Sequence, residues 1–314
     1  MSIYDIIIIG GGPAGMTAGI YAGRGGMDAL LIESPSVMGQ AIMTDMIENY
    51  PGVEKATGIE LMNSFKKQAL EFGLKTELGT VNALSKDLHG GEPAWKVEGD
   101  NGVNSSRAVI IATGAVPKKL GVPGEEELVG RGVSYCATCD GAFFKGKDIV
   151  VVGGGDTAVE EAIFLTRFAG KVKIIHRRER LRAARIIQDR AFDNPKIDFR
   201  WNSVVEEIGG GEKVQKIKVK DVNTAQVDEM PCEGVFIFAG WKPNTGFLED
   251  MVELDEKGHI IVDDHMRSSK EGVFAAGDCC RKSLHQVVTA CGDGAIAAYS
   301  AQHYVEELKG TAYK

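Results

Sequence analysis

The stretch Tyr4-Asp-Ile-Ile-Ile-Ile-Gly-Gly-Gly-Pro-Ala-Gly15 places a short apolar run directly before a glycine-rich turn. Such a β-branched run is typical of a strand buried on both faces of a parallel sheet. A helical pattern follows over residues 13–24, and a second apolar run at 29–33 ends in Glu33. The order strand, Gly-x-Gly-x-x-Gly, helix, strand and acid predicts a dinucleotide-binding unit of an α/β fold.

The glycines of this first loop have different predicted tasks. Gly10 makes the tight turn, Gly12 lets the backbone approach a pyrophosphate, and Gly15 lets the helix pack on the strand. The free amides at the helix start face the phosphates. Glu33 ends the second strand, at the spacing where a carboxylate can accept hydrogen bonds from a ribose diol. The predicted contacts are Gly10, Gly12, Pro13, Ala14, Gly15 and Glu33.

The same arrangement returns later in the chain, where the run at 148–153 leads into a second glycine loop. His176 follows Gly153 at the same spacing as Glu33 follows Gly10, so it stands where the first unit has its acid. Arginines follow it, and guanidinium groups bind the 2′-phosphate that a carboxylate would repel, so this unit is predicted to prefer NADPH. A solvated basic turn is the alternative. The predicted contacts are Gly153, Gly155, Asp156, Thr157, Ala158, His176, Arg177, Arg178 and Arg182.

The two units therefore prefer different ligands. A chain that holds two dinucleotides commonly passes a hydride from nicotinamide to flavin. We assign FAD to the first unit and NADPH to the second.

Composition excludes several classes of protein. The 40 glycines among 314 residues lack a Gly-X-Y repeat, and 44% of residues are hydrophobic, which excludes collagen-like and disordered chains. The net charge of −8 argues against a general affinity for nucleic acid or anionic membranes. We expect no membrane span and no signal peptide, and hence a cytoplasmic protein, because no apolar run is long enough and the start of the chain lacks a basic region.

The rest of the chain suggests a discontinuous first domain. We expect a loop at 35–52, a helix at 58–73 and strands and hairpins at 74–112. In the second unit we expect antiparallel strands at 214–219 and 234–239, with Gly209–Gly211 as a hairpin turn. A strand leads into Gly277-Asp278, whose carboxylate suits the sugar or ribityl part of a flavin, and a helix follows at about 289–308. The predicted fold is two Rossmann-like, doubly wound, three-layer domains: FAD-binding 1–117 and 245–314, with NADPH-binding 118–244 inserted.

Cys136 and Cys139 lie shortly before the second glycine loop, inside the second domain. Thiols at this spacing can form a short-loop disulfide that accepts two electrons and passes them on by thiol–disulfide exchange. Asp140 could handle the accompanying proton, or it could simply cap a helix. Half of a zinc site and buried inert thiols are the alternatives for the pair, and no metal site is predicted. The other four cysteines have no spacing that implies chemistry.

Together these residues resemble the low-molecular-weight, bacterial-type thioredoxin reductases of the pyridine nucleotide-disulfide oxidoreductase family, over nearly the whole chain. The motifs that carry the resemblance are both glycine loops, Gly39-Gln40, Glu48-Asn-Tyr-Pro-Gly52, Ala112-Thr-Gly114, Cys136-Ala-Thr-Cys-Asp-Gly141, His176-Arg-Arg178 with Arg182, Gly240-Trp-Lys-Pro-Asn-Thr245 and Gly277-Asp278.

The resemblance implies an activity and roles for residues. Cys139 would lie next to the flavin, Cys136 would attack thioredoxin, and Asp140 would be the acid. The family also implies a homodimer. Further contacts with FAD are implied for Gly39, Gln40, Asn49, Thr113, Gly114, Gly277, Asp278 and Gln286.

The chain departs from the family pattern near the flavin site. His285 and Val287 stand where the family usually has Arg and Ala around the central Gln, and Asp293 replaces the Thr of Gly-Thr-Gly. The pair Cys279-Cys280 is also unusual, and the sequence offers no function for it.

The predicted activity is reduction of a thioredoxin disulfide by NADPH. Because the dithiol and the NADPH loop share one domain, we expect that domain to rotate about linkers near 115–121 and 242–246 between half-reactions. The alternatives are a flavin-dependent dithiol oxidase that uses oxygen and a non-enzymatic redox-sensing nucleotide-binding protein.

Overall fold

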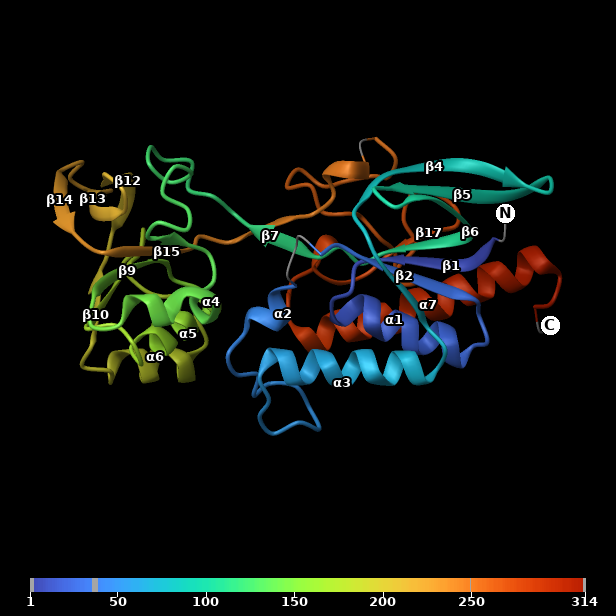
Figure 1. The fold of residues 1–314 in the computed structure, drawn as a ribbon, viewed down its shortest axis with the longest axis horizontal. Helices are drawn as coiled ribbons and strands as arrows, with labels where there is room; N and C mark the ends of the chain where they lie inside the picture. The colour runs from blue at the N-terminus through green and yellow to red at the C-terminus, as the bar shows by residue number, and fades with distance from the viewer. Residues whose placement is uncertain (1–2, 36–38, 249, 313–314) are drawn as a thin grey trace. The chain divides into compact units, whose positions relative to one another are not determined.

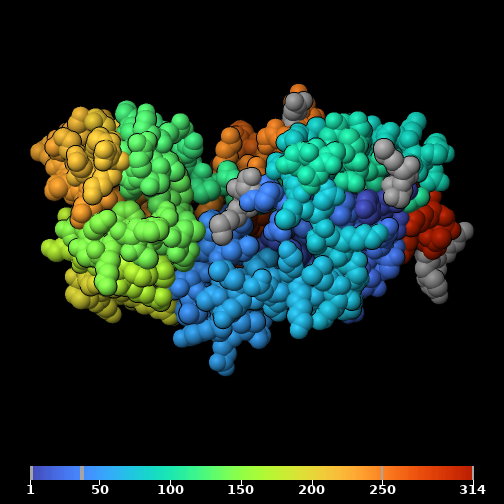
Figure 2. Space-filling model, viewed as in Figure 1, coloured from blue at the N-terminus to red at the C-terminus, as the bar shows by residue number. Residues whose placement is uncertain are grey.

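The structure is a computed structural model that describes residues 3–35, 39–248 and 250–312. The chain divides into two compact units, of which unit 1 combines Met1–Val116 with Lys242–Lys314 and unit 2 is Pro117–Trp241. The predicted boundaries, after residues 117 and 244, lie slightly further along the chain. Figure 2 shows the N-terminal segment, in blue to teal, and the C-terminal segment, in orange to red, gathered in one body, so unit 1 is discontinuous.

Unit 1 has three layers: helices, a parallel sheet and an antiparallel meander (Figure 1). Its elements are β1 (Tyr4–Ile9), α1 (Pro13–Arg24), β2 (Ala29–Glu33), α2 (Gln40–Met43), α3 (Gly58–Glu71), β3 (Lys75–Leu78), β4 (Val81–His89), β5 (Glu92–Gly99), β6 (Gly102–Ile111), β7 (Ala115–Pro117), η2 (Gly246–Leu248), β17 (Val273–Ala275), η3 (Gly277–Cys279) and α7 (Val287–Lys309). The helix α2 lies in the stretch expected to be a loop.

The long strand β6 belongs to two layers. It pairs in parallel with β1 and β17, and in antiparallel with β5, which continues to β4. The parallel sheet therefore runs β3-β2-β1-β6-β17. Alternate residues of β1 serve the two cores: Ile6 and Ile8 pack with the helices, whereas Ile7 and Ile9 pack toward the meander. This explains why the sequence of β1 is a continuous apolar run.

The ends of two helices follow from local sequence. Thr57 and Glu60 form a capping box that begins α3. Gln286 and Thr289 form an analogous pair at the start of α7, which ends at Gly310 in the left-handed conformation. The helix α7 packs against η3.

Unit 2 repeats the three layers. Its elements are β8 (Val133–Ser134), α4 (Ala137–Asp140), η1 (Gly141–Phe144), β9 (Asp148–Gly153), α5 (Asp156–Leu165), β10 (Lys171–Ile175), α6 (Arg185–Phe192), β11 (Ile197–Arg200), β12 (Ser203–Gly210), β13 (Val214–Asp221), β14 (Val227–Pro231) and β15 (Gly234–Phe238). The parallel sheet has the order β11-β10-β9-β15-β8, and β12-β13-β14 is an antiparallel meander. In β9, Ile149 and Val151 face the helices, whereas Val150 and Val152 face the meander.

One strand direction was predicted wrongly. The segment at 234–239 was expected to be antiparallel, but β15 pairs in parallel with both β8 and β9. The antiparallel hairpin at β12 and β13 is confirmed, although Gly209 and Gly210 end β12 and Gly211 begins the turn.

The chain passes between the two units twice. The crossing segments are β7 and β16 (Trp241–Pro243), which pair as a two-stranded sheet.

Candidate functional site

The first glycine loop has the geometry that its sequence predicts. Gly10 has a φ of +112°, and an ideal Cβ on Gly15 would lie 1.9 Å from the Gly10 carbonyl oxygen. An ideal Cβ on Gly12 would meet no described atom within 4 Å. The loop therefore closes tightly at both ends and leaves open space at its middle glycine, where backbone amides at the start of α1 can meet a pyrophosphate.

Glu33 lies directly over this loop. An ideal Cβ on Gly11 would be 2.4 Å from the Glu33 Cδ, so the carboxylate fills the space that a side chain at residue 11 would take. The Lys66 Nζ lies 3.7 Å from the Glu33 Oε2. The carboxylate is thus placed beside the phosphate loop, as a ribose ligand requires, and Lys66 is a neighbour that the sequence did not reveal.

Two polar residues predicted to contact FAD meet each other. The Asn49 Nδ2 donates a hydrogen bond of 3.0 Å to the Gln286 Oε1, although the two residues lie far apart in the sequence. Gln40 instead donates from its Nε2 to the Ala115 carbonyl at 2.9 Å, and Gly39 is the N-cap of α2. Nothing in these contacts conflicts with a role at the flavin.

Thr113 and Gly114 follow β6. The Thr113 hydroxyl donates to the Asn244 carbonyl at 2.7 Å, and the Asn244 N–H donates to the Gly114 carbonyl at 3.0 Å. Gly114 has a φ of +63°, which favours glycine. These bonds join the chain on either side of the inserted unit.

Asp278 supplies the clearest sign that a ligand belongs here. Its Oδ1 is buried and accepts no hydrogen bond from any residue that the structure describes, and the nearest cationic groups, on His285 and Lys282, lie 3.5 and 3.8 Å away. A buried oxygen without a donor is costly, whereas a hydroxyl of a bound cofactor would satisfy it. The residues of unit 1 therefore fit FAD, and Gly277-Asp278 would hold its sugar or ribityl part.

The second glycine loop repeats the first. Gly153 has a φ of +154°, and its ideal Cβ would lie 2.5 Å from the Phe238 carbonyl oxygen and 2.6 Å from the Ala158 Cβ. The nearest described atom to an ideal Cβ on Gly155 is the Arg182 Nη2 at 3.9 Å. The middle of this loop is therefore open on one side and bordered by a guanidinium group.

His176 occupies the place that Glu33 has in the first loop. An ideal Cβ on Gly154 would lie 2.3 Å from the His176 Nδ1. The ring is buried against the edge of Trp201, and its Nε2 has no hydrogen-bond partner in the described chain. Burial, and then the charge of Arg182, lowers the pKa of His176, so the ring is neutral at pH 7.

The arginines of this loop lie at the surface. Arg177, Arg178 and Arg182 are all exposed, and the Arg182 N–H donates to the Gly154 carbonyl at 2.7 Å. The Asp156 carboxylate accepts the Ala184 N–H at 2.6 Å, which ties the arginine-bearing segment to the first turn of α5. Exposed guanidinium groups held beside an open phosphate loop fit NADPH.

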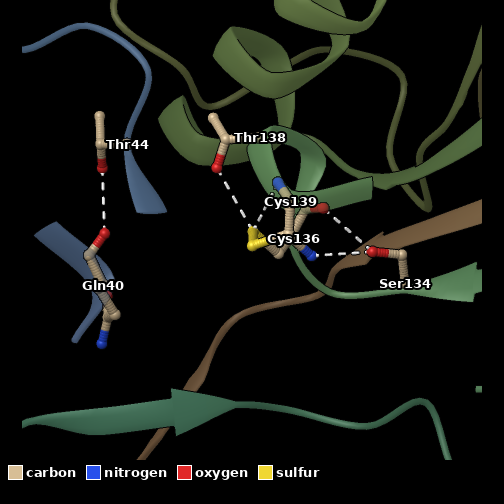
Figure 3. The surroundings of a disulfide bond; sticks show 6 residues. All are labelled: Gln40, Thr44, Ser134, Cys136, Thr138 and Cys139. Atoms are coloured by element: carbon tan, nitrogen blue, oxygen red, sulfur yellow. Dashed lines mark hydrogen bonds between the residues drawn. A yellow bond between two sulfur atoms is a disulfide. The ribbon is translucent and has the colours of Figure 1, made fainter. Parts of the chain in front are cut away.

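Cys136 and Cys139 form a disulfide at the start of α4 (Figure 3). The Cys136 Sγ accepts the Cys139 N–H at 3.1 Å and lies 3.4 Å from the Thr138 Oγ1. The Ser134 hydroxyl accepts the Cys136 N–H at 3.0 Å, a contact that sequence reasoning missed. Cys139 is exposed and Cys136 is half-buried. The sulfur of Cys136 is thus the one that the backbone would stabilise as a thiolate.

The other four cysteines are free and buried: Cys232, Cys279, Cys280 and Cys291. Burial raises the pKa of the Cys232 thiol to about 12, which makes it unreactive.

Within the described part of the chain, no group of three or more His, Cys, Asp or Glu residues could hold a metal ion. No helix among residues 3–35, 39–248 and 250–312 is both long and apolar enough to cross a membrane.

A sequence profile of the pyridine nucleotide-disulphide oxidoreductases matches residues 4–294. The chain belongs to this family. It is 51% identical over 310 residues to the thioredoxin reductase of Bacillus subtilis (strain 168), covering 98% of this chain and 97% of that protein. It is 49% identical over 314 residues to the thioredoxin reductase of Peptoclostridium litorale, covering 98% of each. The crystal structure of Lactococcus lactis thioredoxin reductase matches with a TM-score of 0.93 at 47% identity, covering 97% of this chain and 99% of that one.

Family membership confirms several predictions. The fold with two nucleotide-binding domains is confirmed, as is an oxidoreductase with a redox-active disulfide. Enzymes of this family use FAD and NADPH, so the predicted cofactor pair is also confirmed. The contacts of individual residues with either cofactor stay predictions.

Proposed function

We propose that this protein reduces the disulfide of a thioredoxin at the expense of NADPH, with FAD in unit 1 and NADPH in unit 2. The observation that carries the proposal is the Cys136–Cys139 disulfide in the same unit as the loop that bears Arg177 and Arg178. The relatives named thioredoxin reductase, which match over nearly their whole length, support it.

The chemistry of the dithiol follows from its surroundings. Bound FAD would supply a two-electron carrier between the nicotinamide and this disulfide. Once both cysteines are reduced, the Cys136 thiolate, stabilised by the Cys139 N–H, attacks one sulfur of the thioredoxin disulfide and the other thioredoxin sulfur leaves as a thiol. Cys139 then attacks Cys136 in the mixed disulfide. This restores the Cys136–Cys139 bond and releases reduced thioredoxin.

Asp140 is the proposed proton donor for this exchange. It directly follows Cys139 and is the last residue of α4. A carboxyl at this position can protonate the sulfur that leaves in each step.

The proposal includes a rotation of unit 2 between half-reactions. The dithiol and the NADPH loop belong to one unit, and both must reach the same flavin ring, whose face cannot easily serve both at once. The two crossings near residues 116 and 241 are the candidate hinges. A cross-link that fixes one orientation should preserve one half-reaction and abolish turnover. Full turnover in the locked enzyme would refute the rotation.

A spectrum and an anaerobic assay test the function. The purified protein should show a yellow flavin spectrum, and NADPH oxidation without oxygen should require oxidised thioredoxin. Cys136→Ser should lose thioredoxin reduction and keep flavin reduction by NADPH, whereas Cys232→Ala, a buried cysteine of the same unit, should keep both. A colourless protein would contradict the proposal, and oxidation that needs only oxygen would favour a dithiol oxidase.

We also propose a cytoplasmic homodimer. Four free, buried cysteines suit a reducing compartment. Exposed apolar side chains lie on two helices that pack together in unit 1, Tyr21 on α1 and Ile296 and Tyr299 on α7. Light scattering should give twice the chain mass, and Tyr299→Glu should shift it toward the mass of one chain.

A further inference from the structure

A cluster of charged side chains surrounds Asp278, shortly after the end of β17. Asp278 has an Oδ1 that lies 3.5 Å from the His285 Nδ1 and 3.8 Å from the Lys282 Nζ. Lys282 also makes a much closer contact, 2.6 Å, with the Oδ2 of Asp293. Asp293 is therefore not an isolated charge, because Lys282 links it to Asp278.

Asp293 has a second bond that matters for the site. Its Oδ2 accepts the Gly277 N–H at 3.1 Å, so a residue of α7 holds the first residue of η3. Gly277 has a φ of +82°, and its ideal Cβ would be 2.9 Å from the Ala14 Cβ. Gly294, next to Asp293, would place a Cβ 2.2 Å from the Ala14 carbonyl oxygen. Asp293 thus holds Gly277 close to Ala14, in the first turn of α1.

The position of Asp293 is electrostatically unfavourable for the binding of an anionic ligand. A carboxylate close to the start of α1 would repel the pyrophosphate of a dinucleotide, and Asp278 adds a second negative charge nearby. The positive charge of Lys282 compensates for these negative charges. Its side chain is only 14% exposed, so water screens its charge little.

We propose that Lys282 is a positioning residue of the flavin site: its ammonium group neutralises Asp293, which holds Gly277 and Asp278 in place for an anionic dinucleotide. The inference rests on the proposed binding of FAD in unit 1. It explains how a carboxylate at residue 293 is compatible with an anionic ligand, since Lys282 supplies the compensating charge.

A set of charge variants tests the proposal, with the dissociation constant of FAD as the readout. FAD is removed from the purified full-length protein, and rebinding is followed by flavin fluorescence. Lys282→Met leaves Asp293 charged and without its ion-pair partner, so affinity should fall by roughly 10-fold to 100-fold. Lys282→Arg keeps the charge and should bind FAD within about threefold of the unaltered protein.

The decisive variant is the double replacement Lys282→Met with Asp293→Asn. Asparagine keeps an oxygen that can accept the Gly277 N–H but removes the carboxylate charge, so the double variant should recover most of the lost affinity. Lys96→Met, which removes an exposed ion pair with Glu98 on β5 of the same unit, is the matched control and should bind FAD normally.

The outcomes separate this inference from the proposed function. If Lys282→Met binds FAD as tightly as the unaltered protein, or if the double variant is as weak as the single one, the role of Lys282 is overturned while FAD binding stands. If the unaltered protein itself does not bind FAD, both proposals are overturned.

Discussion

The first glycine loop, at residues 10–15, and the second, at 153–158, share one backbone design and differ in the side chain that each meets at the end of the following strand. In the first loop, an ideal Cβ on Gly11 would collide with the carboxylate of Glu33. In the second, an ideal Cβ on Gly154 would collide with the ring of His176.

The Gly-x-Gly motif does not specify its middle residue, yet in both loops of this protein the middle residue is a glycine that packs against the residue ending the next strand. Residues 11 and 154 occupy the first variable position of Gly-x-Gly, where an added Cβ would meet the carboxylate end of Glu33 in the first loop and the ring of His176 in the second. The residue predicted to read the ribose, Glu33 or His176, is therefore packed onto the glycine loop. A change of that one residue, with arginines after it, can redirect the same backbone to a different dinucleotide.

The largest expected effect comes from replacing Gly15 with alanine, which is the residue that the second loop has at the equivalent position, Ala158. Gly15→Ala would put a Cβ 1.9 Å from the Gly10 carbonyl oxygen, whereas the second loop already carries Ala158. We expect Gly15→Ala to lose bound flavin and about 3 kcal/mol or more of stability, because backbone atoms must move. The flavin absorbance per chain and the thermal midpoint measure both effects.

The reverse change is the control. Ala158→Gly creates no overlap and should cost about 1 kcal/mol from the lost helix propensity at the start of α5. If Gly15→Ala keeps its flavin and its thermal midpoint, the close packing of the first loop is not required for cofactor binding.

The next effect concerns the arginines that only the second loop has. In the double variant Arg177→Ser with Arg178→Ser, kcat/KM for NADPH should fall by roughly 100-fold to 1000-fold, since two charge-assisted contacts with a 2′-phosphate are lost. The same constant for NADH should change by less than about threefold. Arg131→Ser, which removes an exposed arginine elsewhere in unit 2, should alter neither. An equal loss with both cofactors would show that these arginines do not read the 2′-phosphate.

Local patterns explain why the two loops could be predicted from sequence. Each strand, loop and helix lies within about 30 residues, and the glycine spacing, the apolar runs and the ribose-reading position are all visible in the chain itself. The Cys136–Cys139 pair is equally local, because the two cysteines share one short helix start.

Features that depend on distant partners could not be predicted in this way. The direction of β15 is set by β8 and β9, which lie much earlier in the chain, so its sequence alone suggested the wrong pairing. The helix α2 is too short to show periodicity. Lys282 was not singled out from the sequence, because it follows η3 while Asp293 faces it from α7, and only the fold brings the Lys282 Nζ to 2.6 Å from the Asp293 Oδ2.

A smaller effect sharpens the role of Glu33. Glu33→Gln keeps the shape over Gly11 but removes the charge that strengthens hydrogen bonds from a ribose diol, so the dissociation constant of FAD should rise about 10-fold. Glu54→Gln, an exposed change in the same unit, should leave it unaltered. Titration of the flavin-free protein measures both. Unchanged affinity in Glu33→Gln would mean that the carboxylate does not hold the ribose.

The smallest expected effect concerns the neutral ring of His176. Its pKa is lowered by burial and by the nearby arginines, so below about pH 6.5 the unfolded chain binds a proton at this site that the folded chain does not. The contribution to stability is therefore full above about pH 6.5 and is lost as the pH falls toward the lowered pKa. His176→Asn should make the unfolding free energy less dependent on pH as the pH falls below about 6.5, in the protein without nucleotides. His265→Asn, an exposed histidine of unit 1, should keep the original pH dependence. The second loop should therefore lose stability in acid through the buried ring of His176, and parallel pH curves for both histidine variants would contradict this prediction.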